Sequence, residues 1–201
     1  MKLLDVILGR TKPVRSRAEE LFAISTSAVT LQTRLNLKPT GRAGLAVRPL
    51  QASEFEATEK EMRGLLEVAS RETGGLVALA KDEYGYLWVV VEDEQFEDVV
   101  ATLYTATIAL SDAGYLDRVL AALFQFSDED GKEICWIYNF KRGRFYPFIP
   151  LRTTGQRRDN AEELRLTAVM EGELPIEKDP SQWYALWGAP LDAKQRSLEA
   201  S

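Results

Sequence analysis

The sequence predicts an α+β fold: a mainly antiparallel sheet flanked by helices. Helical and strand patterns come in blocks along the chain, without the strict alternation that a parallel sheet needs. Two pairs of strand-like runs are each joined by a short break containing glycine, which is typical of β-hairpins. They are Leu76–Lys81 with Tyr86–Val91, and Glu133–Phe140 with Arg144–Ile149.

The first twelve residues have the pattern of a short amphipathic helix. Leu3, Leu4, Ile7 and Leu8 recur at helical spacing and form one apolar stripe. A helix this short needs a surface to lie on. The protein's own body, a partner and a membrane interface are all candidates, and protein is favoured because the polar face carries little positive charge.

A longer helix is predicted over Ser16–Leu37, with Ser16 as N-cap and Glu19 completing a capping box. Its apolar positions are Leu21, Phe22, Val29 and Leu35. A strand over Gly44–Leu50 and a helix from Ser53 to about Arg71 follow.

The middle of the chain supplies the first hairpin and a further helix. Residues 87–91, LWVVV, are apolar at consecutive positions, which predicts a central strand covered on both faces. A helix is expected from about Phe96 to Ala113, and a helical turn leading into a strand over Tyr115–Phe126.

The second hairpin combines a predicted core with a basic surface. It holds six aromatic residues, which bury large areas, so one side of the hairpin is expected to anchor a core. They are Trp136, Tyr138, Phe140, Phe145, Tyr146 and Phe148. Its turn is Lys141-Arg142-Gly143, and Arg144 follows.

A helix over Arg157–Met170 is expected to bury Leu164, Leu166 and Val169. The segment after it contains two prolines followed by Trp183, Tyr184 and Trp187, and predicts a strap that aromatic side chains attach to the body. The predicted organisation is therefore an N-terminal helix (1–12), a single α+β domain (16–190) and a flexible tail (191–201).

Composition excludes several kinds of chemistry. The 201 residues include no histidine and one cysteine. A Ser-His-Asp relay and a metal site built on His or paired Cys are therefore excluded, and no cofactor is expected. Cys135 lies among aromatics on a predicted strand, where Cys usually behaves as a small buried hydrophobe. No apolar stretch reaches transmembrane length, so we expect a cytoplasmic protein, with the inner face of the membrane as a further location.

Charge is distributed unevenly along a chain whose net charge is −6. Residues 139–158 contain six Lys or Arg and no acid, whereas acids cluster at 92–98 and 128–133. This segregation favours specific docking of a protein partner, and the acidic total argues against nucleic acid. The predicted partner-binding residues are Lys141, Arg142, Arg144, Arg157 and Arg158.

Catalysis by carboxylates is the alternative of a different class. It would need a deep pocket enclosing two acids with raised pKa values. Glu177 and Asp179, beside the strap tryptophan, come nearest to such a pair, although capping or ion-pair roles are favoured for both.

Several motifs together resemble one family. They are LLDVILGRTKP at the start, VTLQ (29–32), PTGRAGL (39–45), WIYNFKRGRFYPFIP (136–150), RRDNAEELRL (157–166) and LPIEKDPSQWYALWG (174–188). The chain resembles the phage-shock-protein-A-associated protein B family (PspAB) from Met1 to about Pro190.

The resemblance implies an accessory protein of the PspA membrane-stress system. It implies a PspA-like protein as partner and, more distantly, a membrane metalloprotease of the HtpX type, and it assigns no catalytic or binding residues. The expected role is a non-enzymatic adaptor; peripheral membrane binding through residues 1–12 is the alternative. The order of elements also resembles the type III secretion chaperone-like, YbjN-like fold.

Overall fold

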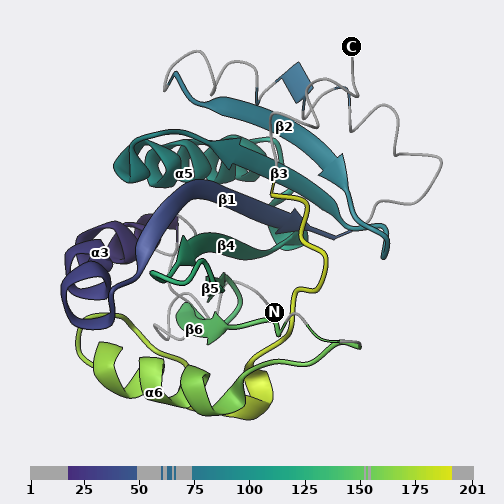
Figure 1. The fold of residues 1–201 in the computed structure, drawn as a ribbon. Helices are drawn as coiled ribbons and strands as arrows, with labels where there is room; N and C mark the ends of the chain where they lie inside the picture. Colours follow the sequence, from purple (N-terminus) through teal and green to yellow (C-terminus); the bar gives the residue numbers. More distant parts are fainter. Residues whose placement is uncertain are drawn as a thin grey trace, which may run out of the picture.

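The computed structural model describes residues 18–48, 60, 63–64, 66, 74–151, 153 and 155–191, and these confirm an α+β fold. Six antiparallel strands form one open sheet in the order β2-β3-β1-β4-β5-β6 (Figure 1). The strands are β1 (Lys38–Val47), β2 (Leu76–Lys81), β3 (Leu87–Glu92), β4 (Val119–Ser127), β5 (Glu133–Asn139) and β6 (Arg144–Phe148). The helices are α3 (Phe22–Leu35), α5 (Phe96–Asp112) and α6 (Asn160–Met170), with 3-10 turns η1 (Leu116–Arg118) and η2 (Pro180–Gln182).

The two faces of the sheet are covered differently. Helices α3 and α5 pack on one face, and α6 lies along the β6 edge (Figure 1). The opposite face is crossed by residues 175–191, which we call the strap. The strap begins on β6, where the N–H of Phe145 donates to the carbonyl of Pro175 at 2.8 Å. Each face of the sheet therefore has its own apolar layer: the helix-side core under α3 and α5, and the strap-side core under the strap.

The centre of the sheet follows from its sequence. Strand β3 lies between β2 and β1, and its first five residues are buried, as the run LWVVV predicts. The predicted turn and strand after α5 are confirmed by η1 and β4.

The second hairpin buries both of its sides. Trp136, Tyr138, Phe140 and Phe145 belong to the helix-side core, whereas Tyr146 and Phe148 belong to the strap-side core. The prediction that one side anchors a core is therefore incomplete, because the strap covers the second side as well.

Helix α3 is shorter than predicted and buries a different stripe. It begins at Phe22, while the predicted cap Ser16 lies outside the described residues. Of the four predicted apolar positions, Leu21 and Leu35 are buried, whereas Val29 is 69% and Phe22 39% exposed. The buried stripe is Leu21, Ile24, Leu31 and Leu35, and the 3.6-residue period turns position 29 away from it.

Strand β1 starts earlier than the predicted Gly44–Leu50. Gly41, at φ 75°, and a register shift against β4 between Pro39 and Ala43 let the strand continue through its glycine and proline. Leu50 lies outside the described residues, as does most of the helix predicted over Ser53–Arg71, whose described positions 60, 63, 64 and 66 are helical.

Helix α6 begins three residues later than predicted. Asp159 caps it by accepting a hydrogen bond from the N–H of Glu162 at 3.2 Å. Leu164 is 53% exposed, so its predicted burial is wrong. The buried residues are Glu163, Leu166 and Met170, which share one stripe of the helix.

The strap is attached by aromatic residues, as predicted. Trp183 is buried, its indole stacks on Tyr146 with ring centroids 6.4 Å apart, and its Nε1–H donates to the Glu177 carbonyl at 2.9 Å. Leu191, the first residue of the predicted tail, is itself buried in the strap-side core. Residues 192–201 lie outside the described residues.

Candidate functional site

The turn between β5 and β6 presents an ordered group of cations. The Asn139 side-chain oxygen accepts hydrogen bonds from the N–H groups of Lys141 (3.0 Å) and Arg142 (3.2 Å), and Gly143 takes a positive φ of 64°. Lys141, Arg142 and Arg144 are all exposed. The backbone of the turn therefore fixes where these three side chains begin.

The strap adds a fourth cation beside them. Lys141, Arg142, Arg144 and Lys178 line a shallow depression of about 510 Å³ together with Ile176 and Glu177. We call these four cations the basic tip. Lys178 pairs with Glu171 at 2.7 Å, whereas Lys141 and Arg144 have no ion-pair partner in the described part of the chain.

Glu177 connects the basic tip to the strap. It pairs with Arg142, whose hydrogen bond is the main reason that the pKa of Glu177 is lowered. A second hydrogen bond, from the N–H of Asp179 at 3.0 Å, also holds the carboxylate. Asp179 in turn caps η2 by accepting from the N–H of Ser181. The pKa of Asp179 is lowered mainly by the Ser181 hydroxyl, which donates to the same carboxylate at 2.7 Å, and next by that N–H. The ion-pair and capping roles predicted for Glu177 and Asp179 are confirmed.

The structure separates Arg157 and Arg158 from the basic tip. Arg158 directs its guanidinium inward, where Nε donates to both carboxylate oxygens of Glu163 at 2.9 Å. Arg157 is exposed but does not line the depression. Of the five predicted partner-binding residues, Lys141, Arg142 and Arg144 are therefore brought together, and Lys178 is a neighbour that sequence reasoning missed.

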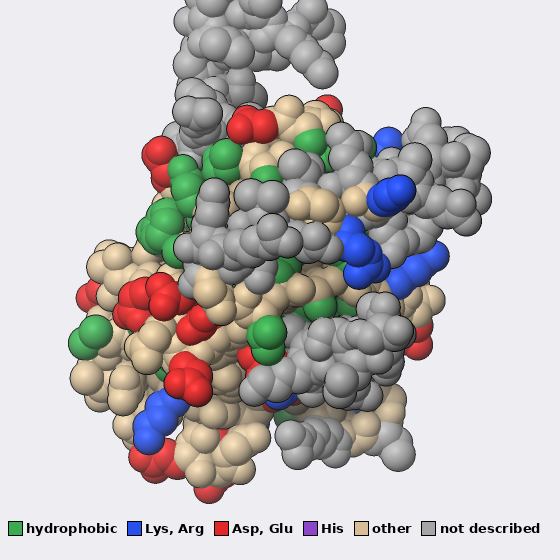
Figure 2. Space-filling model, turned by 90° about the horizontal axis from the view of Figure 1, so that it is seen from above, with side chains coloured by type: hydrophobic (Ala, Val, Ile, Leu, Met, Phe, Trp, Pro, Cys, Tyr) green, Lys and Arg blue, Asp and Glu red, His purple; other side chains and the backbone are tan. Residues whose placement is uncertain are grey.

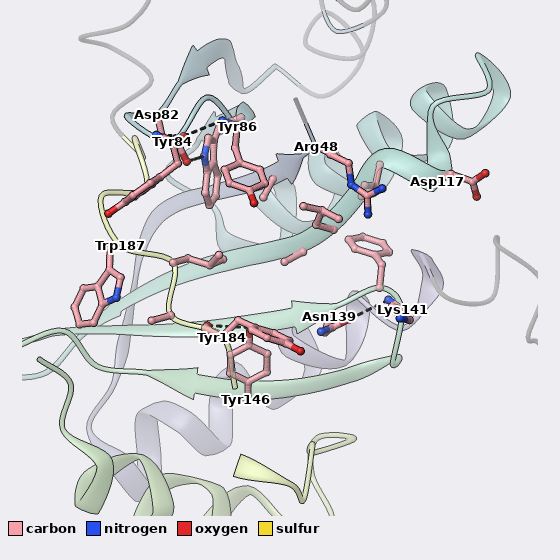
Figure 3. A pocket seen from close by; sticks show the side chains of 18 of the residues that line it. Arg48, Asp82, Tyr84, Tyr86, Asp117, Asn139, Lys141, Tyr146, Tyr184 and Trp187 are labelled. Atoms are coloured by element: carbon pink, nitrogen blue, oxygen red, sulfur yellow. Dashed lines mark hydrogen bonds between the residues drawn. The ribbon is translucent and has the colours of Figure 1, made fainter. Parts of the chain in front are cut away.

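A second feature absent from the sequence analysis is a large apolar pocket on the strap face. Its volume is about 810 Å³, and it lies between the sheet, the strap and the β2–β3 turn (Figure 3). Ala46 of β1 and Ala121 of β4 line it and are paired across the two strands. Two small side chains opposite each other leave space above the sheet. The alanines were visible in the sequence, but their pairing was not.

Aromatic residues and a few polar groups complete the pocket wall. Trp88, Tyr146 and Trp187 belong to it, and Trp187 is held edge-on against Phe148 with ring centroids 4.8 Å apart. The lining also includes Arg48, Asp82, Asp117, Asn139 and Lys141. Asp82 accepts hydrogen bonds from the N–H groups of Tyr84 and Tyr86 and from the Trp88 indole, each at 2.9 Å.

The pocket does not have the geometry that carboxylate catalysis requires. Asp82 is bound to three donors as part of the turn, and Asp117 is exposed. Among the described residues, the carboxylate with a raised pKa is Glu163, where burial outweighs the hydrogen bonds of Arg158; it does not line the pocket. Among the described residues, no pocket therefore encloses two acids with raised pKa values, which carboxylate catalysis would need.

Cys135 and the metal-ligating residue types were also considered. The Cys135 thiol is buried, and burial raises its pKa well above its usual value, which suits a core residue rather than a nucleophile. No group of three or more Cys, Asp or Glu able to hold a metal ion occurs in the part of the chain that the structure describes.

Charges of opposite sign are separated on the surface as well as along the sequence. Figure 2 shows one face of the molecule, on which acidic side chains gather mainly on the left and Lys and Arg mainly on the right. The apolar stripe Leu3, Leu4, Ile7 and Leu8 lies outside the described residues. Within the described ranges, every helix is too short or too polar to cross a membrane.

The fold and the site define an α+β protein with one open antiparallel sheet, an exposed basic tip and an apolar pocket. The chain belongs to the PspA associated protein B family, PspAB, whose family model matches residues 1–191. The family description names association with PspA, which is consistent with an accessory role. Comparisons with curated proteins and with solved structures found no match. The similarity to the type III secretion chaperone-like fold stays a prediction.

Proposed function

We propose that the protein is a non-enzymatic adaptor that binds a PspA-like protein through the basic tip, on the cytoplasmic side of the membrane. The observation that carries the proposal is the pair of exposed cations, Lys141 and Arg144, that have no ion-pair partner among the described residues. The family description supplies the class of partner. An acidic helical surface of that partner is the complementary chemistry.

The basic tip is suited to docking because its support is rigid. Asn139 orders the turn, the Arg142–Glu177 pair joins it to the strap, and the β6 edge is covered by the strap. Side chains presented by an ordered turn lose less conformational entropy on binding than those of a loose loop. Charges at an exposed rim act mostly on association rate and partner choice.

The apolar stripe at residues 3–8 extends this proposal. It would add contact with the same partner or with the inner membrane surface. A membrane metalloprotease of the HtpX type is a second partner to assay.

The experiment measures capture of a purified PspA-like protein by the full-length chain. The test variant is the double change Lys141→Glu and Arg144→Glu. The control is Arg34→Glu with Lys38→Glu, which reverses two other exposed cations and gives the same net charge. The proposal expects loss of capture for the first pair only. Equal capture by both, or equal loss, would show that the basic tip does not select the partner.

Peripheral membrane binding is tested separately by vesicle flotation. Replacing Leu4 and Ile7 by Asp should release the protein from vesicles if the stripe holds it there. Flotation that is the same with and without these changes would remove the membrane from the proposal and leave the basic tip unaffected.

A further inference from the structure

We propose that the pocket on the strap face binds a monomeric fatty acid, with its carboxylate at Arg48 and Lys141 and its apolar chain over Ala46 and Ala121. The pocket shares Lys141 with the basic tip, and none of the other basic-tip residues lines it. Its volume of about 810 Å³ lies within the range of roughly 300–1,000 Å³ found for small-molecule sites.

The interior of the pocket matches an apolar body. The most buried polar groups in its wall are the Trp88 indole and the Tyr146 hydroxyl, and both already donate hydrogen bonds. The indole donates to Asp82 at 2.9 Å, and the hydroxyl donates to the Tyr184 carbonyl at 3.1 Å. A sugar or a nucleotide base would find few free partners there and would lose its hydration. An alkyl chain loses no hydrogen bonds in such a site.

The pocket remains open because the side chains at its base are small. Ala46 and Ala121 face each other across β1 and β4, while the flanking strap supplies Ala185, Leu186 and Trp187 above them. The strap-side core packs on either side of this point, with Trp183 at the middle of the strap and Leu191 at its end. The open volume is therefore bounded by packed elements of the same domain.

One end of the pocket carries positive charge. Arg48 is exposed, it follows the end of β1, and its backbone N–H donates to the carbonyl of Arg118 at 2.8 Å. Lys141 follows the end of β5, and Figure 3 shows both cations at the same end of the pocket. Neither has an ion-pair partner in the described ranges. Asp117 also lines the pocket, and in Figure 3 its carboxylate points away from Arg48.

These features together select an amphiphile with one negative end. A carboxylate between two unpaired cations gains charge-assisted hydrogen bonds, and the chain behind it gains from leaving water. The exposed tyrosines Tyr84 and Tyr184 stand at the rim, where an amphipathic ring can contact both the chain and solvent.

The experiment titrates full-length protein with tetradecanoate below its micelle concentration, by calorimetry and by the fluorescence of the pocket tryptophans Trp88 and Trp187. Tetradecanol, which has the same chain without the charge, is the matched ligand. We expect saturable binding of one tetradecanoate per chain, at least about fivefold tighter than tetradecanol, because hydrogen bonds to charged groups contribute more than neutral ones.

Three variants separate the charge from the cavity. Arg48→Gln with Lys141→Gln should weaken tetradecanoate to the level of tetradecanol, and Arg144→Gln, at the basic tip, should leave both unchanged. Ala121→Phe should prevent binding of both ligands, and its thermal unfolding reports whether the fold is kept. Arg48 and Lys141 are exposed, so the double Gln variant is expected to fold. It therefore tests the carboxylate contact even if Ala121→Phe fails to fold.

Several results would overturn the proposal. Absence of saturable tetradecanoate binding is one, and unchanged tetradecanoate affinity in the Arg48→Gln, Lys141→Gln double variant is another. Binding to vesicles of anionic phospholipid without binding to monomeric tetradecanoate would assign the cations to a membrane surface. A dimer that Ala121→Phe dissociates would assign the pocket to a second copy of the chain.

Discussion

Arg158 and Glu163 form an ion pair where α6, β6 and the strap meet. Arg158 Nε lies 2.9 Å from both carboxylate oxygens, and one of these oxygens also accepts the N–H of Ile149 at 2.8 Å. The rest of the guanidinium donates to the carbonyls of Trp183 (2.8 Å) and Pro147 (3.2 Å) and lies 5.2 Å from the centroid of the Phe148 ring. One pair therefore ties three segments together.

Removing the charge of Glu163 should destabilise the fold. In Glu163→Gln, the half-buried guanidinium of Arg158 loses its counter-charge, and breaking a buried pair in this way typically costs about 3–5 kcal/mol. Urea unfolding followed by far-UV circular dichroism measures the change. The control is Glu162→Gln, which breaks the more exposed pair with Arg165 and should cost less than about 1 kcal/mol. Equal losses of unfolding free energy in the two variants would show that the Arg158–Glu163 pair does not hold these segments together.

Acid should weaken the attachment of the basic tip to the strap. The pKa of Glu177 is lowered, mainly by the hydrogen bond from Arg142. A lowered folded-state pKa means that the ionised carboxylate stabilises the fold above the unfolded pKa of about 4.3, and that this stability is lost as pH falls through the folded pKa.

The measurement is the free energy of unfolding as pH is lowered from neutral to below the unfolded carboxylate pKa of about 4.3. Glu177→Gln should lose less stability over this window than the wild-type protein does. Glu173→Gln, at an exposed position nearby, is the control and should keep the wild-type slope. A Glu177 variant with the wild-type slope would show that the pair does not contribute to acid sensitivity.

Gly41 should tolerate substitution worse than a glycine of similar backbone conformation. Gly41 and Gly131 have φ values of 75° and 73°. A Cβ on Gly41 would lie 2.2 Å from the carbonyl oxygen of Asp93, whereas one on Gly131 would meet nothing within 4 Å. Both Ala variants incur about 1–2 kcal/mol for the left-handed conformation. In urea unfolding, Gly41→Ala should lose about 2 kcal/mol more stability than Gly131→Ala, because the backbone at Asp93 must move. Equal losses of stability would show that the added Cβ is accommodated without a clash.

Salt should weaken the proposed partner complex through the basic tip. Exposed charges are screened over a Debye length of about 8 Å at physiological ionic strength. The affinity of the wild-type chain for a PspA-like protein should therefore fall as salt is raised. The Lys141→Glu and Arg144→Glu variant should bind weakly at every salt concentration; retained salt dependence in this variant would place the steering charges elsewhere.

The sequence predicted the elements whose local signals agree with their packing. Residues 87–91 are apolar throughout and form a central strand, and the Lys141-Arg142-Gly143 break forms the turn it predicts. Errors fell where a local signal was outweighed by neighbours. Leu164 looks like a core residue, but the stripe of α6 that faces inward holds Leu166, Met170 and Glu163, and Arg158 pairs with the buried Glu163 carboxylate.

The candidate sites divide in the same way. The cations at 141, 142 and 144 are adjacent in sequence, so their grouping was predictable from the turn alone. Lys178 joins them only because the strap returns to the β6 edge. Arg158 was assigned to the surface by its charge, and only the packed structure shows its buried partner.

The sequence by itself determined the fold class, the hairpin turn and the absence of histidine chemistry, because these depend on residue type and short-range spacing. The tertiary structure alone decided that Ala46 faces Ala121, that Arg48 and Lys141 share one pocket, and that Arg158 turns inward. The first two bring together residues that are distant along the chain, and they depend on strand order. Glu163 is only five residues from Arg158, but the direction of Arg158 also depends on the carbonyls of Trp183 in the strap and Pro147 in β6. Local propensities carry no information about strand order or about the path of the strap.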